Sequence, residues 1–470
     1  MKCERIRTRN QRCIRERIIV RGRLILDTPT CLGSGDTDGD ADLIILRDSI
    51  EEKALLMGSS IAGALRNYLR DYQSGYSSIE SSLLFGGQRT EEEGEQSPLI
   101  VNDALSCEQM KVELRDGVKI NSITRTAEDG AKYDLELLEA GTTFDICCEL
   151  LIENNKDQLI RELVIVLQGL EKGEISIGMK KRRGFGRCHV EKWQVWQFDL
   201  RENEQRIKWL TFPHWTTGLL PEYSIYDSIA DALGVSVDGE DKRDRITIQA
   251  TFSLASPLLI RSGQASTDKA PDVVHLKSRR NGELKSILSG TSLAGVLRHR
   301  AERIVNTLKK NTNIIDEIFG VDFSNDTTKK PKASRLTVDE VEINNTTDLV
   351  QNRIAIDRFT GGALHGALFN EQPIFGNDET SLVIKLELRQ PKPFEIGLLL
   401  LLLKDLWTGD LPVGGTSSVG RGRLQGKEAT IKFGKETWTI VQKSVDELLI
   451  ADNPEDLEKF VADLHKEVTI

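Results

Sequence analysis

Four aspartates stand at every second position in the segment SGDTDGDADLIILRD, residues 34–48: Asp36, Asp38, Asp40 and Asp42. Carboxylates at this spacing could ligate calcium, form a solvated acidic turn, or place one carboxylate beside a substrate. An EF-hand loop that began at Asp36 would need glycine at its sixth position and glutamate at its twelfth. The chain has Ala41 and Arg47 there, so the EF-hand motif fails.

Only one of the four aspartates has a counterpart elsewhere in the chain. Asp42 opens the string DLIILR, and Asp272 opens the similar string DVVHLK, with a basic residue five positions later in both (Arg47 and Lys277). We therefore expect one functional aspartate per copy, held where a loop enters a short strand. The alternative is that the shared aspartate only caps a turn. The other three acids are interpreted as a solvated turn.

The two aspartates belong to a longer internal repeat, which is the first thing to look for in a chain of 470 residues. Five segments recur in the same order at offsets that drift from 228 to 236 residues: DTPTCLGSG and ASPLLIRSG, DLIILR and DVVHLK, GSSIAGALR and GTSLAGVLR, LFG and IFG, and GFGR and GRGR. The repeat predicts two homologous domains, residues 14–200 and 244–437, joined by a linker at 201–243 and followed by an acidic helical tail at 438–470.

Each copy has the same order of elements. Alternating strands open the copies at residues 18–26 and 246–254, and helices with apolar residues at helical spacing begin near Gly58 and Gly290. Further strands, a leucine-rich helix and a glycine-rich loop follow. This mixture predicts an α+β fold of the β-α-β-β-α-β kind in each domain.

Glycine and arginine recur together near the end of each copy, in KKRRGFGR at residues 180–187 and GRGR at residues 420–423. A dinucleotide fingerprint needs a third glycine that His189 and Gln425 replace. We interpret the loops as polyanion-binding, because glycine lets a backbone approach phosphates and arginine supplies charge. The hydroxyl-rich helix starts could add unpaired N–H groups. The candidate residues are Arg182, Arg183, Gly184, Gly186, Arg187, Gly420, Arg421, Gly422 and Arg423 in the loops, and Ser59, Ser60, Arg66, Thr291, Ser292 and Arg298 on the helices.

Composition limits the class of protein. The net charge of −10 argues against a uniformly basic coat but allows a local groove. The amino-terminal residues lack the apolar stretch of a secretion signal, and the longest apolar run, Ile396–Leu403, is too short to span a membrane and is expected in a buried helix. Seven cysteines without zinc spacing indicate free thiols in a reducing cytosol. No repeated histidine or Ser-His-Asp arrangement is present.

These strings together resemble the RAMP superfamily of RNA-binding CRISPR proteins, in particular the backbone subunits of type III effector complexes. The string AIDRFTGGALHGALF at residues 355–369 is typical of such subunits, and SITRTAEDGAKYDLEL is its degenerate counterpart, which pairs Arg125 with Arg358. The resemblance covers both halves, so the chain looks like a tandem fusion of two subunits, as in III-D complexes.

The resemblance implies two ferredoxin-like, RRM-type domains, each with an inserted β-hairpin thumb that contains Arg125 or Arg358. It also implies a cytoplasmic antiviral ribonucleoprotein with guide RNA, complementary target RNA and other RAMP-type and small subunits as partners. Asp42 and Asp272 would then cut the target RNA, with a divalent cation, Mg²⁺, as cofactor through ligands that stay unknown.

Three other functions stay open from the sequence. The first is a non-catalytic RNA scaffold with the same groove. The second is an endoribonuclease that processes the guide precursor, and the third is a protein-interaction module that uses the acidic tail. The repeat favours one functional aspartate per domain, and cleavage of RNA at that aspartate is what the resemblance implies.

Overall fold

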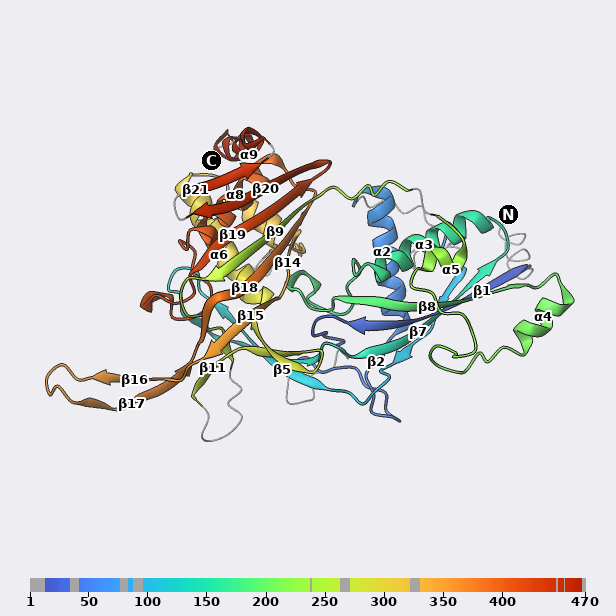
Figure 1. The fold of residues 1–470 in the computed structure, drawn as a ribbon, viewed down its shortest axis with the longest axis horizontal. Coiled ribbons are helices and arrows are strands. Elements are labelled where there is room, and N and C mark those ends of the chain that lie inside the picture. The colour runs from blue at the N-terminus through green and yellow to red at the C-terminus, as the bar shows by residue number, and fades with distance from the viewer. Residues whose placement is uncertain are drawn as a thin grey trace.

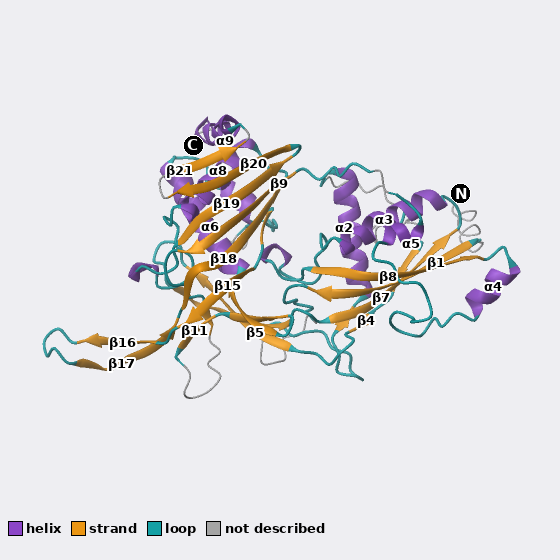
Figure 2. Cartoon of the chain, in the orientation of Figure 1, coloured by secondary structure: helices purple, strands orange, loops and turns teal. Residues whose placement is uncertain are grey.

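The computed structural model describes residues 13–33, 42–76, 83–87, 96–236, 239–262, 271–321, 330–444, 447–451 and 453–466. Two domains lie side by side, and the chain crosses once from the first to the second (Figure 1). In each domain a β-sheet carries helices on one face, as the colouring by secondary structure shows (Figure 2). The α+β fold predicted from the sequence is confirmed.

The first domain is built on a sheet in the order β3-β7-β1-β8, in which every pair of neighbours is antiparallel. Helix α2 connects β1 to β3, and α3 connects β7 to β8. This is the order and connectivity of a ferredoxin-like β-α-β-β-α-β unit. The elements are β1 (Glu16–Leu26), β2 (Leu55–Leu56), α2 (Gly58–Ser74), β3 (Leu99–Val101), β4 (Ala104–Leu105), β5 (Val112–Ile120), β6 (Ala127–Leu138), β7 (Thr143–Ile152), α3 (Lys156–Glu171), η1 (Lys181–Arg183) and β8 (Cys188–Asp199).

The second domain repeats this unit and extends its sheet at both edges. The central strands run in the order β15-β18-β9-β19, with β12 and β13 beyond β15 and with β20 and β21 beyond β19. The elements are β9 (Arg245–Leu254), β10 (Arg261–Ser262), β11 (Val273–His275), β12 (Lys277–Arg280), β13 (Glu283–Leu288), α6 (Gly290–Thr307), α7 (Asn313–Phe319), β14 (Leu336–Val338), β15 (Val341–Asp348), β16 (Gln351–Ile356), β17 (Ala363–Gln372), β18 (Ile374–Arg389), α8 (Pro393–Trp407), η2 (Ser417–Val419), β19 (Leu424–Phe433), β20 (Glu436–Ser444), β21 (Glu447–Ala451) and α9 (Pro454–Lys466).

Each domain has its own hydrophobic core. In the first, alternate residues of β1 such as Ile18 and Val20 pack with Leu65 on α2, and all three are almost fully buried. In the second, residues of β9 pack with Leu293 and Leu297 on α6. The period-2 strands and period-3.6 helices therefore meet on one face, as the sequence predicts. The leucine run in α8 is buried, as expected, except that Leu400 and Leu401 are half-buried. No helix in the described part of the chain could cross a membrane.

Two β-hairpins, which we call the thumbs, are inserted between the second and third strands of the two units. The first thumb is β5–β6 and the second is β16–β17. The second thumb projects away from the body of the molecule, whereas the first lies beneath the junction of the domains (Figure 1). The two strings assigned to thumbs by resemblance lie in these hairpins.

The expectation of a helical tail at 438–470 is wrong for its first part. Strands β20 and β21 pair with each other, and β20 pairs with β19, so the tail extends the sheet of the second domain. Among the described residues of the tail only α9 is helical, and it packs so closely on α8 that a side chain on Gly397 would meet the Phe460 carbonyl. The linker also folds, because α4 (Asn203–Leu210) and α5 (Ile229–Leu233) lie within it, and Phe212 covers Trp196 of β8.

The cysteines in the described residues are free thiols, as expected for a chain without a disulfide framework. Burial raises the pKa of the Cys31 and Cys147 thiols, which makes them poor nucleophiles at neutral pH. They serve as small apolar residues, because Cys31 packs beside Leu135 and Phe185.

Candidate nucleic-acid interface and cleavage residues

Asp42 lies at the base of the first thumb and is exposed to solvent. Its backbone N–H donates to the Asp134 carbonyl of β6 over 3.1 Å, and its Oδ2 accepts from the Asp134 N–H over 2.9 Å. Leu43 then forms a parallel bridge to Leu135. These contacts fix the carboxylate at the point where the loop joins the thumb, as the repeat predicts.

Asp272 has the same position in the second domain. It is also exposed, its Oδ2 accepts from the Asn370 N–H of β17 over 2.8 Å, and Val273 pairs in parallel with Glu371. One oxygen of each carboxylate thus accepts a hydrogen bond from a backbone N–H at the base of a thumb. The agreement between two segments 230 residues apart in sequence is the main geometric feature of the candidate site.

The residues around the two aspartates do not form a metal-binding cluster by themselves. Among the described residues, no group of three or more His, Cys, Asp and Glu side chains could hold a metal ion. The basic residues that follow the aspartates pair with acids: Arg47 contacts Glu136 at 3.0 Å, and Lys277 contacts Asp348. Asp36, Asp38 and Asp40 lie outside the described residues.

The tips of the thumbs share one turn, and it corrects the register of the sequence comparison. Asn121 in the first thumb and Asp357 in the second each accept from the N–H groups two and three residues later. Arg125 at φ 58° takes the position of Gly361 at φ 69°, so the equivalent of Arg125 is Gly361 and not Arg358. Each tip presents an exposed apolar side chain at the same place, Ile123 (89% exposed) and Phe359 (99%).

The second glycine of each Gly-x-Gly-Arg loop is required by packing inside its own domain. A Cβ on Gly186 would lie 1.8 Å from the Ile177 carbonyl oxygen, and one on Gly422 would lie 1.9 Å from that of Val413. The same glycines donate their N–H groups to the Pro29 and Pro257 carbonyls. The interpretation that Gly186 and Gly422 admit a polyanion is therefore wrong, since their backbone faces protein.

A cavity of about 300 Å³ lies between the start of α2 and the loops that precede η1. Ser59, Ser60 and Asn67 line it from the helix, and Lys181 closes it from η1. The comparison of the two halves of the sequence did not identify Asn67 or Lys181 as site residues. Their signal was available, since Asn67 lies two turns after Ser60 on the same helix face and Lys181 stands within the basic run.

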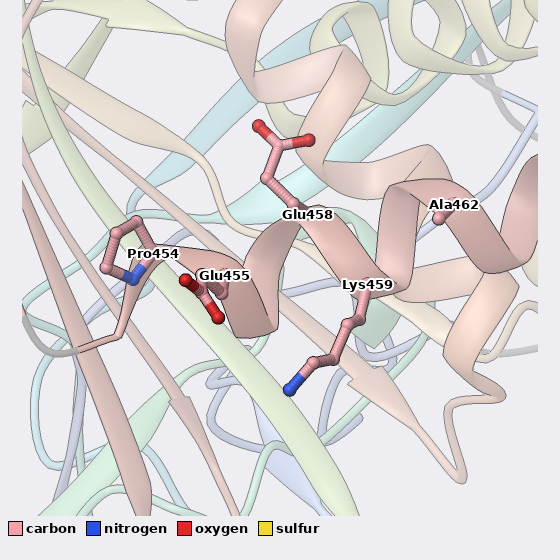
Figure 3. Close-up of a pocket in the computed structure, with 5 residues that line it drawn as sticks. All are labelled: Pro454, Glu455, Glu458, Lys459 and Ala462. Carbon is pink, nitrogen blue, oxygen red and sulfur yellow. The ribbon is translucent and has the colours of Figure 1, made fainter.

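A second, shallower hollow of about 480 Å³ lies on α9, where Glu455, Glu458 and Lys459 border it (Figure 3). Helix α9 lies on the side of the second domain opposite β11, which follows Asp272 (Figure 1). Its lining is acidic on balance, so it is a poor surface for RNA. We assign it no part in the site.

A model of the RAMP superfamily matches the chain twice, at residues 23–189 and 251–425. The two matches coincide with the two ferredoxin-like units and together cover well over half of the 470 residues. The chain belongs to the RAMP superfamily. No curated protein matches it. Membership supports a role as a CRISPR-associated RNA-binding subunit, and the tandem arrangement of two RAMP domains is confirmed.

Two of the loop arginines that were predicted to bind RNA, Arg187 and Arg421, pair with carboxylates of the protein, whereas the side chain of Arg423 is exposed. The Nη2 of Arg187 donates to both carboxylate oxygens of Asp339, at 2.7 and 2.8 Å. Arg421 is buried and donates to Glu371 over 2.8 Å. Arg423 is exposed, and its backbone N–H donates to Ser256. Arg187 and Arg421 are therefore neutralised by carboxylates and are not free to bind phosphate.

Arg182 and Arg183 keep the character expected of phosphate ligands. Burial lowers the pKa of Arg182 to about 10, and Arg389 nearby adds to the effect. Burial and the charge of Arg298 likewise lower the pKa of Arg183, whose Nη1 is buried without a hydrogen-bond partner. Arg389 and Arg298 pair with Asp71 and Asp316, whereas Arg182 donates only to the Thr337 hydroxyl among the printed side-chain contacts, so a bound anion would stabilise the charges on Arg182 and Arg183.

The helix starts are less open than predicted. The Gly58 N–H donates to Asp103 over 2.7 Å, and Ser289 caps α6 by accepting from the Ser292 N–H. Ser59 and Ser60 are exposed and Thr291 is half-buried. The hydroxyls of α2 can therefore still face a ligand, whereas Ser292 is engaged in the cap.

Arg66 and Arg298 perform one structural task in both domains. Arg66 donates to the Gly86 carbonyl over 3.3 Å, and Arg298 donates to the Gly320 carbonyl over 2.7 Å and to Asp316. They hold the loops that contain LFG and IFG against the helices. Arg125 lies elsewhere, at the tip of the first thumb. Burial lowers the pKa of His299 on α6, and the charges of Arg298 and Arg125 lower that pKa further.

Proposed function

We propose that this RAMP protein is a guide-RNA-binding backbone subunit of a type III CRISPR ribonucleoprotein and that it cleaves complementary target RNA at Asp42 and Asp272. Guide and target RNA, together with other RAMP-type and small subunits, are its proposed partners. The proposal separates into RNA binding, for which family membership is the support, and cleavage, for which the aspartate geometry is the support.

The observation that carries the cleavage proposal is the identical placement of the two aspartates. Each is exposed, and each is held through one oxygen by a thumb N–H. A turn-capping role would need the same hydrogen bond but would not require the carboxylate to be exposed to solvent. An exposed, fixed carboxylate beside a hairpin is suited to act on a strand that the hairpin separates.

Cleavage of RNA requires few chemical groups from the protein. RNA supplies its own nucleophile, the 2′-hydroxyl, and in-line attack on the adjacent phosphate needs a displaced nucleotide more than it needs a general base of special pKa. The carboxylate can orient the hydroxyl or hold a cation against the phosphate. Mg²⁺ prefers one or two carboxylates with water and phosphate oxygens, so a single aspartate would suit it once RNA supplies the remaining ligands, and it would offset charge on the phosphate.

The cations at the junction of the domains would hold the guide. Arg182 and Arg183 lie on η1 where no carboxylate neutralises them among the described residues, and Lys181 borders the cavity beside Ser59. Phosphate contacts of this kind position RNA without reading its sequence, which pairing to the guide supplies. Arg183→Gln should therefore weaken guide binding at all sequences and lower the salt slope by about 1.

The decisive experiment uses Asp42→Asn and Asp272→Asn, alone and together, in the assembled complex with a complementary RNA and magnesium. Asparagine keeps an oxygen to accept the thumb N–H and removes only the charge, so the fold is preserved. Each single change should remove one cut from the ladder of products, and the double change should remove both. RNA binding should be unaltered.

Asp48→Asn is the matched control, because Asp48 lies in the same segment but accepts from the Ile50 and Glu51 N–H groups in a turn. It should leave both cuts in place. A full ladder from the double variant would show that the aspartates only brace the thumbs, and the chain would then be a non-catalytic scaffold. Weaker guide binding in Arg183→Gln, beside unaltered RNA binding in the double aspartate variant, would separate the two halves of the proposal.

A further inference from the structure

Hydrogen bonds to the site aspartates establish which residues of the two thumbs are equivalent. Asp134 donates its backbone N–H to Asp42, and Asn370 donates its own to Asp272. The cross-strand neighbours of these two residues, and the residues two positions later along the strand, are then equivalent as well. The equivalent pairs are Asp134 and Asn370, Asp116 and Asn352, and Glu136 and Gln372. In each pair, a carboxylate of the first thumb is replaced in the second by the amide of the same length.

The three carboxylates of the first thumb share one face of the hairpin. Successive residues of a strand point to opposite faces, so Asp134 and Glu136 lie on the same face, and Asp116 joins them as the cross-strand partner of Asp134. The contacts agree with this, because the Lys132 Nζ lies 3.5 Å from Asp134 and 3.8 Å from Asp116. The base of the first thumb is therefore acidic where the base of the second carries amides.

One of the three replacements is compensated by another residue. Glu136 pairs with Arg47 at 3.0 Å, whereas Lys277, the equivalent of Arg47, pairs with Asp348. The charge that Gln372 lacks is thus supplied by Asp348, and this pair does not distinguish the two sites. The difference between the sites rests on the other two pairs.

The second thumb has cations on its other face. Glu371 follows Asn370 on β17 and is buried. Its carboxylate contacts Arg421 at 2.8 Å, Arg353 at 3.1 Å and Arg261 at 3.9 Å. The equivalent positions of the first domain hold Leu135, Phe185, Gly117 and Gly33. One carboxylate among three guanidiniums leaves positive charge at the second site, which can offset the charge of a phosphate.

Asp134 has an oxygen that no hydrogen bond satisfies. Its Oδ1 is buried and accepts no hydrogen bond from the described residues, and the Lys132 side chain 3.5 Å away is 64% exposed, so it can move aside for a metal ion. Asp134 therefore offers a second carboxylate beside that of Asp42. Mg²⁺ is held in this way by one or two carboxylates together with substrate phosphates. The Oδ1 of Asn370 is also without a hydrogen bond, but it is an uncharged amide oxygen and attracts a cation less.

We propose that Asp42 and Asp134 together bind a divalent cation that contacts the scissile phosphate at the first site, and that no such cation contacts the phosphate at the second site. The inference rests on the proposed cleavage and assigns to each site one of the two roles open to its carboxylate. Asp42 holds the cation, with Asp134 as the second protein ligand and with RNA and water as the others. Asp272 orients the 2′-hydroxyl, and the arginines around Glu371 offset the charge of the phosphate.

Sulfur in place of one nonbridging oxygen of the scissile phosphate reports a metal contact, because Mg²⁺ binds sulfur poorly and the softer Mn²⁺ binds it better. The assembled complex is given target RNAs with this change at either cut, each isomer separately. At the first cut, sulfur in one isomer should slow cleavage in Mg²⁺ by about tenfold or more, and Mn²⁺ should restore the rate. At the second cut, Mn²⁺ should restore nothing.

Exchange of the two residues should exchange this behaviour. Asp134→Asn should abolish the rescue by Mn²⁺ at the first cut, and Asn370→Asp should create a rescue at the second. Both variants keep the backbone N–H that holds the site aspartate, and the other cut of the same complex shows that assembly is intact. Asp116→Asn is the matched control, because it removes a carboxylate from the same face but from the other strand of the thumb, and it should leave the rescue in place.

Metal binding is measured separately from cleavage, by electron paramagnetic resonance of Mn²⁺ in the complex with a target RNA that lacks the 2′-hydroxyl at both cuts. Asp134→Asn should bind one Mn²⁺ ion fewer than the unsubstituted complex, and Asp116→Asn should bind the same number. Unchanged Mn²⁺ binding by Asp134→Asn, an equal loss in Asp116→Asn, or equal rescue at both cuts would overturn the inference. Absence of both cuts in the unmodified target would instead refute the proposed function, and the resonance measurement would still decide whether Asp134 binds a cation.

Discussion

For Arg421, the role interpreted from the sequence differs from the contact that the structure shows. The sequence places it in a basic loop, but its guanidinium donates to Glu371 over 2.8 Å and to Gln351 over 2.6 Å, and the Arg421 and Glu371 side chains are 4% and 2% exposed. The first domain has Phe185 and Leu135 at the equivalent positions, both buried. One domain thus uses an ion pair where the other uses an apolar pair.

Arg421→Phe should destabilise the second domain because it leaves the Glu371 carboxylate buried. Breaking a buried pair costs about 3–5 kcal/mol. Arg353 stays within 3.1 Å of Glu371 and offsets part of the loss, so we expect about 3 kcal/mol. At about 2–4 °C per kcal/mol for a domain of this size, the midpoint of thermal unfolding should fall by about 6–12 °C. Adding Glu371→Leu recreates the pair of the first domain and should restore stability to within about 1 kcal/mol.

The assay is urea denaturation combined with hydrogen exchange, because the amides of β17 and β19 report the second domain separately from the first. Arg423→Ala is the control, since Arg423 is exposed and should change stability by less than about 0.5 kcal/mol. A double variant no more stable than Arg421→Phe would refute the reasoning. Normal stability of Arg421→Phe with weakened RNA binding would show that Arg421 is a phosphate ligand after all.

Three further outcomes follow from buried groups. Burial lowers the pKa of His275 to about 4 from an ordinary 6.5, so the unfolded chain takes up the proton first, and the second domain should lose about 3 kcal/mol as pH falls from 6.5 to 4; denaturation curves of His275→Gln should show less of this loss. Gly186→Ala forces a Cβ to within 1.8 Å of a carbonyl oxygen and should cost more than about 3 kcal/mol, whereas Gly420→Ala meets only the strain of its positive φ, about 1 kcal/mol, both measured by urea denaturation. Glu340→Gln removes the fully buried carboxylate that Arg115 and Arg280 share, although Glu113 still pairs with Arg115, and should weaken the domain contact by about 3 kcal/mol, seen as a larger radius of gyration in X-ray scattering.

The fold was predictable because its signals are local or repeated. Strand β1 was expected at 18–26 and spans Glu16–Leu26, and β9 was expected at 246–254 and spans Arg245–Leu254. The alternation of apolar and polar residues in these strands follows from burial on one face of a sheet. Because the pattern occurs in both copies, each copy supports the prediction made for the other. The placement of Asp42 and Asp272 was predictable for the same reason, since the repeat alone marked them out.

The partners of the arginines were not predictable from sequence. Arg187 binds Asp339, which lies 152 residues later, and Arg421 binds Glu371, which the fold brings to the base of the second thumb. The sequence of a basic loop does not show whether the counter-charge of the loop is a phosphate or a carboxylate from another element. Arg182 and Arg183, which form no ion pair with a carboxylate in the described parts of the chain, could be separated from them only once their neighbours were known.

The thumb register failed for a different physical reason. Matching arginine to arginine paired Arg125 with Arg358, but the turn is defined by the side chain that accepts from the backbone, Asn121 or Asp357. The position that adopts positive φ then falls on Arg125 in one thumb and on Gly361 in the other. Asn and Asp are interchangeable in this turn, and that chemistry was the better guide to alignment.

What the two domains share and what they do not share together indicate where function lies. The backbone contacts are duplicated: the Gly186 and Gly422 N–H groups donate to equivalent prolines, and both site aspartates bond a thumb N–H. The interior pairs have changed, as Leu135 and Glu371 show. Packing constrains only the fit between buried partners, and a buried pair can differ between the domains when both partners change together. Packing therefore does not explain why an exposed side chain is the same in both domains. Asp42 and Asp272 meet that condition at the base of the thumbs, which is the physical reason to test them before any arginine.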